Sequence, residues 1–261
     1  MCKQEYYFQT KQFTVGYDGI PIVSDIEIRL KRGEILSLIG PNGAGKTTIL
    51  RSIIKQLKPI AGVAVLDQVS MTSINLSQLS KQMAVVLTDR LQTEMMTVED
   101  VVETGRHPYT GKFGILSDSD HLIVADAMER TRITNMKDQD FTKISDGQKQ
   151  RVMLARALAQ QPDIIILDEP TSFLDIKYKL EFLSIIHKLS RENKLTVIMS
   201  LHEVELAQKI SDQIACFRNG YMDRYGPPKE IFSNDYLLEL YDIQMEQLTP
   251  VFQEMIKNEY R

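Results

Sequence analysis

The sequence is poor in cysteine and in long apolar runs. Only two cysteines occur among its 261 residues, Cys2 and Cys216, too few for a disulfide framework or a zinc site. No apolar run approaches the roughly 18 residues that span a bilayer, and the start Met1–Tyr6 lacks the apolar core of a signal peptide. We therefore expect free thiols in a reducing cytosol and a membrane role only through a partner.

An excess of basic residues is also missing. The net charge is -4 and the pI is near 5.7, so the chain has no overall electrostatic footprint of a nucleic-acid-binding protein. Charged residues make up 25% and hydrophobic residues 43%, the balance of an ordinary soluble protein. The length suits one sizeable core with an insertion.

The most informative segment is a glycine-rich loop that fits Gly-x4-Gly-Lys-Thr. It follows Glu34–Ile39, which reads as a buried strand, and it leads into Thr48–Ile54, which reads as a helix. Glycines let backbone N–H groups surround an anion, and the helix start adds the positive end of its dipole. The segment predicts a nucleoside triphosphate site in which Lys46 reaches the β- and γ-phosphates and the Thr47 hydroxyl binds Mg²⁺. Its residues are Gly40, Pro41, Asn42, Gly43, Ala44, Gly45, Lys46, Thr47 and Thr48.

The remaining patterns predict an α/β fold with a mostly helical insertion at about residues 97–160. Asn219-Gly220 predicts a hairpin, and Tyr17-Asp18-Gly19 predicts a turn. There is no internal repeat and no low-complexity segment. The predicted strands are Phe13–Val15, Ile26–Leu30, Val63–Leu66, Met83–Leu87, Ile164–Leu167 and Thr196–Met199.

Two acids follow the apolar run Ile164–Leu167. A buried strand that ends in acids places them at the sheet edge where nucleotide phosphates bind. Asp168 is predicted to hold Mg²⁺ through water, and Glu169 to act as general base on the attacking water. Without the phosphate loop, the same pair could be a solvated turn.

A helix start precedes these acids. In Ile144–Arg151, either Ser145 or Asp146 can accept from the free N–H groups of the first turn of the helix that follows. This capping role is sufficient locally, whatever the function.

Together these segments resemble the ATP-binding subunits of ABC transporters over essentially the whole chain. Gly40–Thr48 looks like the Walker A loop, Ile164–Glu169 like the Walker B strand and Ile144–Gln148 like the Leu-Ser-Gly-Gly-Gln signature. Ser172–Asp175 is similar to the D-loop. His202 matches the switch histidine, and Tyr17 lies where the family stacks an aromatic ring on adenine.

The resemblance implies a P-loop NTPase core of ABC type, with an N-terminal antiparallel β subdomain and a helical insertion subdomain. It implies segments 1–88 and 161–261 for the core and 89–160 for the Q-loop and helical part. It further implies ATP and Mg²⁺ as ligands and a head-to-tail homodimer with two sandwiched ATP molecules. In each site Ser145, Gly147 and Gln148 of one chain would face the Walker motifs of the other. Asp175 would reach across the interface and His202 would contact the γ-phosphate.

Two positions depart from the family pattern. Asp146 replaces a signature glycine, and we expect its side chain to turn away and cap the helix. Asp89 stands where the Q-loop glutamine is usual. A carboxylate there could keep a catalytic, water-mediated contact to Mg²⁺, or the position could be an ordinary loop residue.

The segment Gly105-Arg106-His107-Pro108 resembles a Gly-Arg-x-Pro stretch in importers of iron-siderophore complexes, haem and cobalamin. In those importers the stretch lines the groove that receives the permease. Locally it is also an adequate helix end. The resemblance implies a peripheral subunit at the cytoplasmic face of the membrane, with a transmembrane permease and an extracytoplasmic binding protein as partners. Of the four histidines, His107, His121 and His187 have no metal-ligand spacing, and we expect no iron site in the chain itself. A subunit for another substrate, an exporter subunit or a soluble ABC ATPase remain the alternatives.

Overall fold

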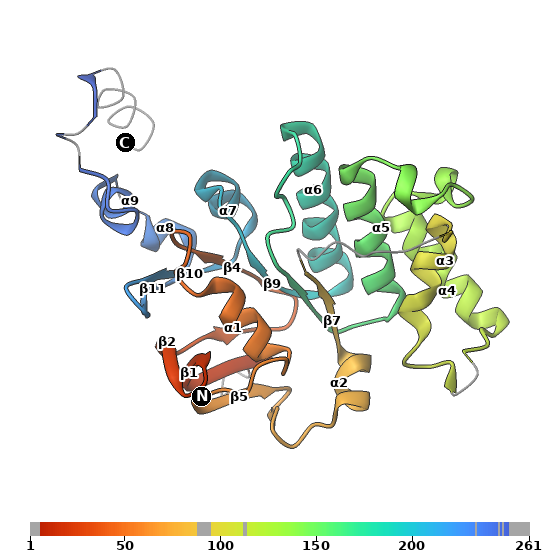
Figure 1. Cartoon of the computed structure of the whole chain (residues 1–261), viewed down its shortest axis with the longest axis horizontal. Coiled ribbons are helices and arrows are strands. Elements are labelled where there is room, and N and C mark those ends of the chain that lie inside the picture. Colours follow the sequence, from red (N-terminus) through yellow and green to blue (C-terminus); the bar gives the residue numbers. More distant parts are fainter. Residues whose placement is uncertain are drawn as a thin grey trace. The chain divides into compact units, whose positions relative to one another are not determined.

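Figure 1 shows the computed structural model, which describes residues 6–87, 95–111, 114–232, 234–244, 246 and 248–250. The chain divides into two compact units. The first unit combines Met1–Lys31, Ile35–Gln68 and Ser200–Arg261, and the second combines Arg32–Glu34 and Val69–Met199. The division into segments 1–88, 89–160 and 161–261 stays a prediction.

The first unit contains a mixed sheet with the strand order β5-β1-β2-β11-β10-β4, and β3 pairs with β1. Its N-terminal strands β1, β2 and β5 are antiparallel, whereas β10 and β4 are parallel. Four helices belong to the described part of this unit: α1 (Lys46–Ile53), α7 (Val204–Ile210), α8 (Pro228–Ile231) and α9 (Asn234–Leu240). The strands are β1 (Phe8–Tyr17), β2 (Ile20–Ile26), β3 (Arg29–Leu30), β4 (Ile35–Ile39), β5 (Ala61–Leu66), β10 (Gln213–Arg218) and β11 (Tyr221–Gly226).

The prediction of one continuous strand over Ile26–Leu30 is wrong. The β2 strand ends at Ile26, and β3 begins only at Arg29. The side chain of Thr10 causes the break, because its hydroxyl donates to the Ile26 carbonyl at 2.8 Å and accepts from the Ile28 N–H at 2.9 Å. That side chain occupies backbone groups that a regular ladder would use.

Both predicted turns of this unit are confirmed. Asp18 and Gly19 connect β1 to β2, and Asn219 and Gly220 connect β10 to β11. All four residues have positive φ angles, between 49° and 81°. Such angles match the right-handed twist of a two-residue hairpin.

The second unit contains three parallel strands in the order β9-β8-β7. They are β7 (Met83–Val86), β8 (Ile164–Leu167) and β9 (Thr196–Ser200), and β6 (Val69–Ser70) precedes them in sequence. Every residue of β8 and β9 is buried, which explains their continuous apolar runs. The helices of this unit are α2 (Leu76–Gln82), α3 (Val98–Glu103), α4 (Asp118–Arg130), α5 (Asp146–Ala159) and α6 (Ile176–Asn193), with short 3-10 turns at η1 (Thr104–Arg106), η3 (Thr134–Met136) and η4 (Phe141–Lys143).

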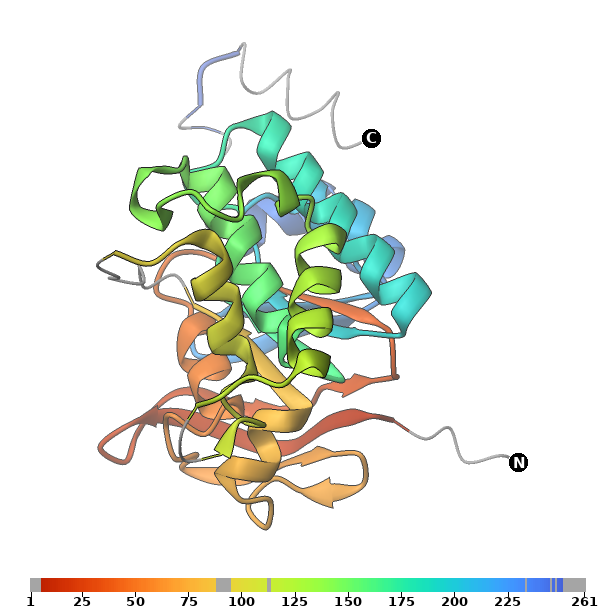
Figure 2. The same cartoon turned by 90° about the vertical axis from the view of Figure 1, so that its right-hand side faces the viewer.

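Helices α3, α4 and α5 lie side by side, as Figure 2 also shows, and they pack around their own apolar core. The predicted helical insertion is therefore present. Each of the three helices starts with a capping box, whose N-cap residues are Thr97, Ser117 and Ser145. Their starts are thus fixed by the local sequence.

Helix α2 was not predicted. Its N-cap Asn75 accepts from the Gln78 N–H at 2.8 Å, and the Gln78 side chain accepts from the Asn75 N–H. An Asn-x-x-Gln capping box was the signal that could have revealed this helix.

Candidate functional site

The glycine-rich loop connects β4 to α1 as the sequence predicts. Gly45 is the N-cap of α1 with φ 92°, and a Cβ there would lie 2.4 Å from Cγ2 of Val23. A Cβ on Gly40 would lie 2.3 Å from the carbonyl oxygen of Phe217. Glycine is therefore required at both positions, by space at Gly40 and by space and backbone angle at Gly45.

The Lys46 side chain is buried within this loop. Its Nζ donates to the carbonyl oxygens of Gly40 at 2.7 Å and Pro41 at 3.0 Å. A buried ammonium beside the N-terminal turn of α1 forms a concentrated positive region. The following Thr47 is half-buried and Thr48 is buried. A triphosphate fits this loop by charge and by the available donors.

The two acids at the end of β8 have different surroundings. Asp168 is 4% exposed, and its N–H donates to the Val86 carbonyl at 2.9 Å. Glu169 is half-buried and has the left-handed φ of 47°. Its Oε2 accepts from the Ser172 hydroxyl at 3.1 Å. A hydrogen bond from the turn thus holds the Glu169 carboxylate.

The start of α5 is capped by Ser145 and not, as we expected, by Asp146. The Ser145 hydroxyl accepts from the Gln148 N–H at 3.3 Å, and Gln148 Oε1 accepts from the Ser145 N–H at 2.9 Å. Asp146 is already the first helical residue, and its Oδ1 lies 4.0 Å from Lys149 Nζ. Ser145 takes the cap because it alone has extended backbone angles, whereas Asp146 lies within the helix.

Asp175 caps α6 in the same manner. Its Oδ1 accepts from the Tyr178 N–H at 3.0 Å, and the residue is exposed. Gly147, at the start of α5, is buried beside this turn, because a Cβ on it would lie 2.9 Å from Cγ of Tyr178. The second unit therefore brings Ser145, Gly147 and Asp175 close together.

His202 and Tyr17 belong to the first unit and are both exposed. The Leu201 N–H donates to the Leu38 carbonyl at 3.2 Å, so His202 emerges beside the strand that enters the glycine-rich loop. Tyr17 ends β1 and is 42% exposed, as a ring that stacks on a ligand must be. Asp89 lies outside the described residues.

The segment after α3 carries a polar network that the sequence did not reveal. Arg106 is 4% exposed; its Nε donates to Asp120 Oδ1 at 2.8 Å and its Nη1 to the Ala159 carbonyl at 2.7 Å. Its guanidinium lies 4.0 Å from the ring centroid of Tyr109, whose hydroxyl donates to the Gln160 carbonyl at 3.0 Å. Arg106 and Tyr109 therefore satisfy two carbonyls at the C-terminal end of α5.

The charge state of this network is well defined. Hydrogen bonds from the Ser117 hydroxyl and N–H, and the Arg106 guanidinium, lower the pKa of Asp120 from 3.8 to about 2. Asp120 is therefore ionised at neutral pH. Gly105 allows the turn after α3 to approach α5 closely, because a Cβ on Gly105 would lie 2.1 Å from the Arg156 carbonyl oxygen.

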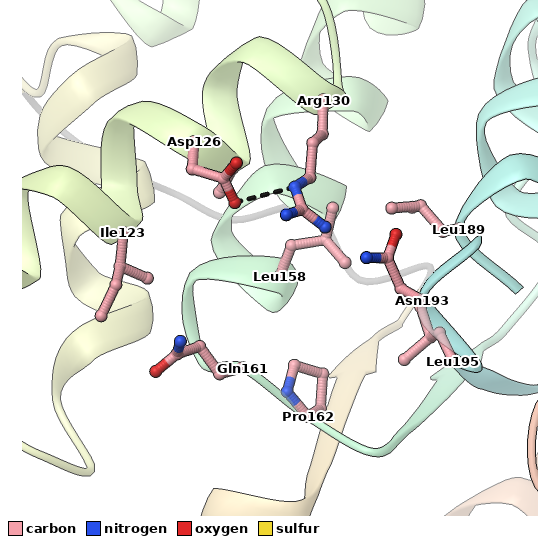
Figure 3. Close-up of a pocket in the computed structure, with 10 residues that line it drawn as sticks. Ile123, Asp126, Arg130, Leu158, Gln161, Pro162, Leu189, Asn193 and Leu195 are labelled. Carbon is pink, nitrogen blue, oxygen red and sulfur yellow. Dashed lines mark ion pairs between the residues drawn. The ribbon is translucent and has the colours of Figure 1, made fainter.

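A small pocket of about 210 Å³ lies near the same end of α5, between α4 and the C-terminal part of α6 (Figure 3). Leu158, Leu189 and Leu195 supply apolar walls, and Arg130 pairs with Asp126 at 2.7 Å on one side. None of the predicted nucleotide-site residues lines it. The pocket therefore gives no support for a second nucleotide site.

A glycine loop between a strand and a helix, and a buried parallel strand that ends in two acids, are the features of a P-loop nucleotide-binding protein. The chain belongs to the ABC transporter family, whose sequence pattern matches residues 23–172. It is an ABC transporter ATPase, which couples ATP hydrolysis to transport.

Individual relatives agree with this assignment. The chain is 42% identical over 236 residues to an uncharacterised ABC transporter ATP-binding protein of Methanocaldococcus jannaschii, covering 90% of this chain and 81% of that protein. It is 33% identical to an iron(3+)-hydroxamate import ATP-binding protein of Bacillus subtilis, covering 92% and 89%. A dimeric ATP-binding cassette solved in a post-hydrolysis state with ADP and Pi superposes with a TM-score of 0.72 at 26% identity, covering 85% and 98%.

Within the described part of the chain, none of the helices has the length and apolar character to cross a bilayer. ABC transporter ATPases dimerise and pair with permeases.

Proposed function

We propose that the chain is the ATP-hydrolysing subunit of an importer for an iron-siderophore, haem or cobalamin-type substrate. The buried Lys46 ammonium at the centre of the glycine-rich loop is the observation that carries the ATP-binding part. The likeness to an iron(3+)-hydroxamate import protein, together with Gly105–Pro108, supports the importer group. An ABC transporter of another substrate specificity is the alternative.

Within one chain, the residues divide into binding and chemical roles. Lys46 donates to the β- and γ-phosphates in place of the loop carbonyls, and the N–H groups of Asn42–Thr48 surround them. The Tyr17 ring stacks on adenine. Thr47 and Asp168 are the residues that would hold Mg²⁺, and Asp89 is proposed to add a water-mediated contact. When bound there, the metal would supply positive charge against the phosphates.

Hydrolysis requires a base and a contact to the γ-phosphate. The Glu169 carboxylate accepts the proton of the attacking water, while the Ser172 hydroxyl holds its Oε2 in orientation. His202 contacts the γ-phosphate from the first unit.

A second copy of the chain completes each site. Ser145 and Gly147 belong to a helix start that carries no phosphate-binding loop of its own, and such a start favours an anion. We infer that it faces the triphosphate of the opposite subunit in a head-to-tail homodimer, with Asp175 reaching across. Because its side chain is engaged in the capping box, Gln148 supports Ser145 in addition to facing the nucleotide.

The transport partners follow from this assignment. We propose that the homodimer binds a transmembrane permease at the cytoplasmic face of the membrane and that an extracytoplasmic binding protein delivers the substrate. Closure of the two subunits on ATP would then do work on the permease.

Co-purification with the membrane partners tests the proposal. The complex should hydrolyse ATP, and iron chelates, haem or cobalamin should stimulate the turnover when supplied with the binding protein. A matched complex carrying Lys46→Ala should assemble but show no turnover. Failure of the wild-type chain to associate with any membrane protein would overturn the proposal, whereas stimulation by an unrelated substrate would favour the alternative.

A further inference from the structure

The first turns of α5 and α6 are in direct contact, although they are separated in sequence by β8. The contact is made by Gly147 and the aromatic ring of Tyr178. A Cβ on Gly147 would lie 2.9 Å from Cγ of Tyr178, and 3.2 Å from its Cβ and Cδ1. The space that a side chain at position 147 would occupy is thus filled by the near part of the Tyr178 ring.

The same residue is joined to the D-loop. Asp175 Oδ1 accepts from the Tyr178 N–H at 3.0 Å, and this bond caps α6. Tyr178 therefore contacts the start of α5 with its side chain and Asp175 with its backbone.

A second contact keeps the two helices in register one turn later. Arg151 Nη1 lies 3.9 Å from Glu181 Oε2, with side-chain exposures of 15% and 33%. Arg151 follows Gly147 by one turn of α5, and Glu181 follows Tyr178 by almost one turn of α6. The ring contact is therefore part of a helix–helix junction.

The segment that leads into this junction is also tied to the proposed general base. The Ser172 N–H donates to the Glu169 carbonyl at 3.1 Å, in addition to the hydroxyl bond to its carboxylate. Leu174 is 9% exposed and anchors the turn before Asp175. Local hydrogen bonds thus recur along this segment, from the Ser172–Glu169 bonds to the Tyr178–Asp175 bond that starts α6.

We propose that Tyr178 is a positioning residue that fixes the start of α5 relative to Asp175. On the proposed function, on which this inference rests, Ser145, Gly147 and Asp175 all face the nucleotide of the opposite subunit. A single ring between them makes the two elements approach that nucleotide as one body. Loss of the ring would leave each element intact but uncouple their positions.

ATP-driven dimerisation measures this positioning directly. In the full-length chain carrying Glu169→Gln, which stops hydrolysis, the dimer dissociation constant is measured by sedimentation with Mg-ATP. Tyr178→Ala should raise it by ~10- to 100-fold, the penalty for small misplacement of interacting groups. The affinity of the monomer for a fluorescent ATP analogue should not change, because the loop around Lys46 belongs to the other unit.

Two matched variants separate positioning from general destabilisation. Tyr178→Phe should behave as the parent, because the atoms nearest Gly147 do not include the hydroxyl. Leu180→Ala removes a side chain that is 51% exposed on the same helix, and should change dimerisation by less than about twofold.

A double variant keeps the test decisive if Tyr178→Ala lowers the thermal midpoint. Gly147→Ala should weaken the dimer because its methyl group meets the ring. Gly147→Ala with Tyr178→Ala should dimerise more tightly than Gly147→Ala alone, a non-additivity expected only of residues in contact. Losses that simply multiply would overturn the inference.

The remaining outcomes are also distinct. If the Glu169→Gln parent dimerises with ATP and Tyr178→Ala does so equally well, the inference is overturned while the proposed function stands. If the parent binds ATP but never dimerises, the proposed homodimer is overturned and the inference falls with it.

Discussion

At the scale of single residues, Glu169 combines three features expected of a catalytic base. It follows a buried strand, its backbone has a left-handed φ of 47°, and Ser172 holds its carboxylate. Non-glycine residues in this region carry local strain and are enriched at functional sites. Glu169 is therefore half-buried with its carboxylate held by Ser172, whereas Asp168 is buried.

Glu169→Gln should keep ATP binding and reduce hydrolysis by roughly 10²–10⁴, the contribution of a positioned general base. The amide keeps the size of the side chain but cannot accept the proton. ATP affinity by titration and steady-state phosphate release measure the two effects. Glu192→Gln, at the exposed C-terminal end of α6, is the matched control and should retain turnover. Turnover near that of the wild type in Glu169→Gln would contradict the assignment of Glu169 as the general base.

The stability contribution of Asp120 should depend on pH. Its pKa is about 2 in the folded chain against an ordinary 3.8, so the ionised form is favoured by folding. A carboxyl group whose pKa is lowered by folding stabilises the folded protein at pH values above its unfolded-state pKa. That contribution is lost as the pH falls through the folded-state pKa. The difference in unfolding free energy between wild type and Asp120→Asn should thus be constant from pH 7 to about 5 and shrink towards pH 2. Urea unfolding across this range, where the wild type remains folded, measures it; a difference that grows on acidification would contradict the account.

At the scale of elements, the C-terminal end of α5 is held by the turn that follows α3. Arg106 and Tyr109 donate hydrogen bonds to the last carbonyls of α5. The Arg156 guanidinium donates to the Thr104 hydroxyl at 2.8 Å. Gly105 lets this turn and α5 approach each other closely. The start of α5 contacts Tyr178. Both ends of this helix are therefore fixed by neighbouring elements.

Gly105→Ala should destabilise the second unit by at least about 1–3 kcal/mol, because the added methyl would overpack against the Arg156 carbonyl. The free energy of unfolding from chemical denaturation measures the loss. Ser184→Ala, at an exposed position of α6, adds no such contact and should stay within about 0.5 kcal/mol of the wild type. Equal stability of the two variants would contradict the close packing at Gly105.

The sequence predicts those elements whose signals are local. The glycine-rich loop, the apolar run of β8 and the Asn219-Gly220 hairpin each combine a pattern with the turn chemistry it requires, and they were placed correctly. The break after Ile26 was missed because the cause, Thr10, is distant in sequence. The contact between Gly147 and Tyr178 was missed for the same reason.

In the candidate site, too, local patterns are predictable from the sequence and contacts between distant residues are not. Residue types and spacing predict Lys46, Asp168 and Glu169, whereas the partner of each polar group depends on the fold. Ser145 and Asp146 could both cap a helix, and only the backbone angles decide for Ser145. The resemblance at Gly105–Pro108 gave no sign of the Arg106 network, whose guanidinium is buried and donates to the Ala159 carbonyl of α5.

At the scale of the whole molecule, the proposed site residues are distributed over both compact units. Lys46, Tyr17 and His202 belong to the first, and Glu169, Ser145 and Asp175 are among those in the second. ABC transporter ATPases act as dimers. We therefore propose that one chain carries two different halves of an ATP site, each completed by another copy.

Cross-linking between the two halves tests this claim most directly. The chain would carry Ala44→Cys in the glycine loop, Ser145→Cys at the start of α5, Glu169→Gln to stop hydrolysis and Cys2→Ser. The remaining Cys216 is buried and its pKa is raised to about 12, so it stays unreactive. A short bis-maleimide should produce covalent dimers with Mg-ATP and few without it, and either cysteine alone should produce far fewer. ATP binding without covalent dimers, or a cross-link formed only within one chain, would contradict the composite site.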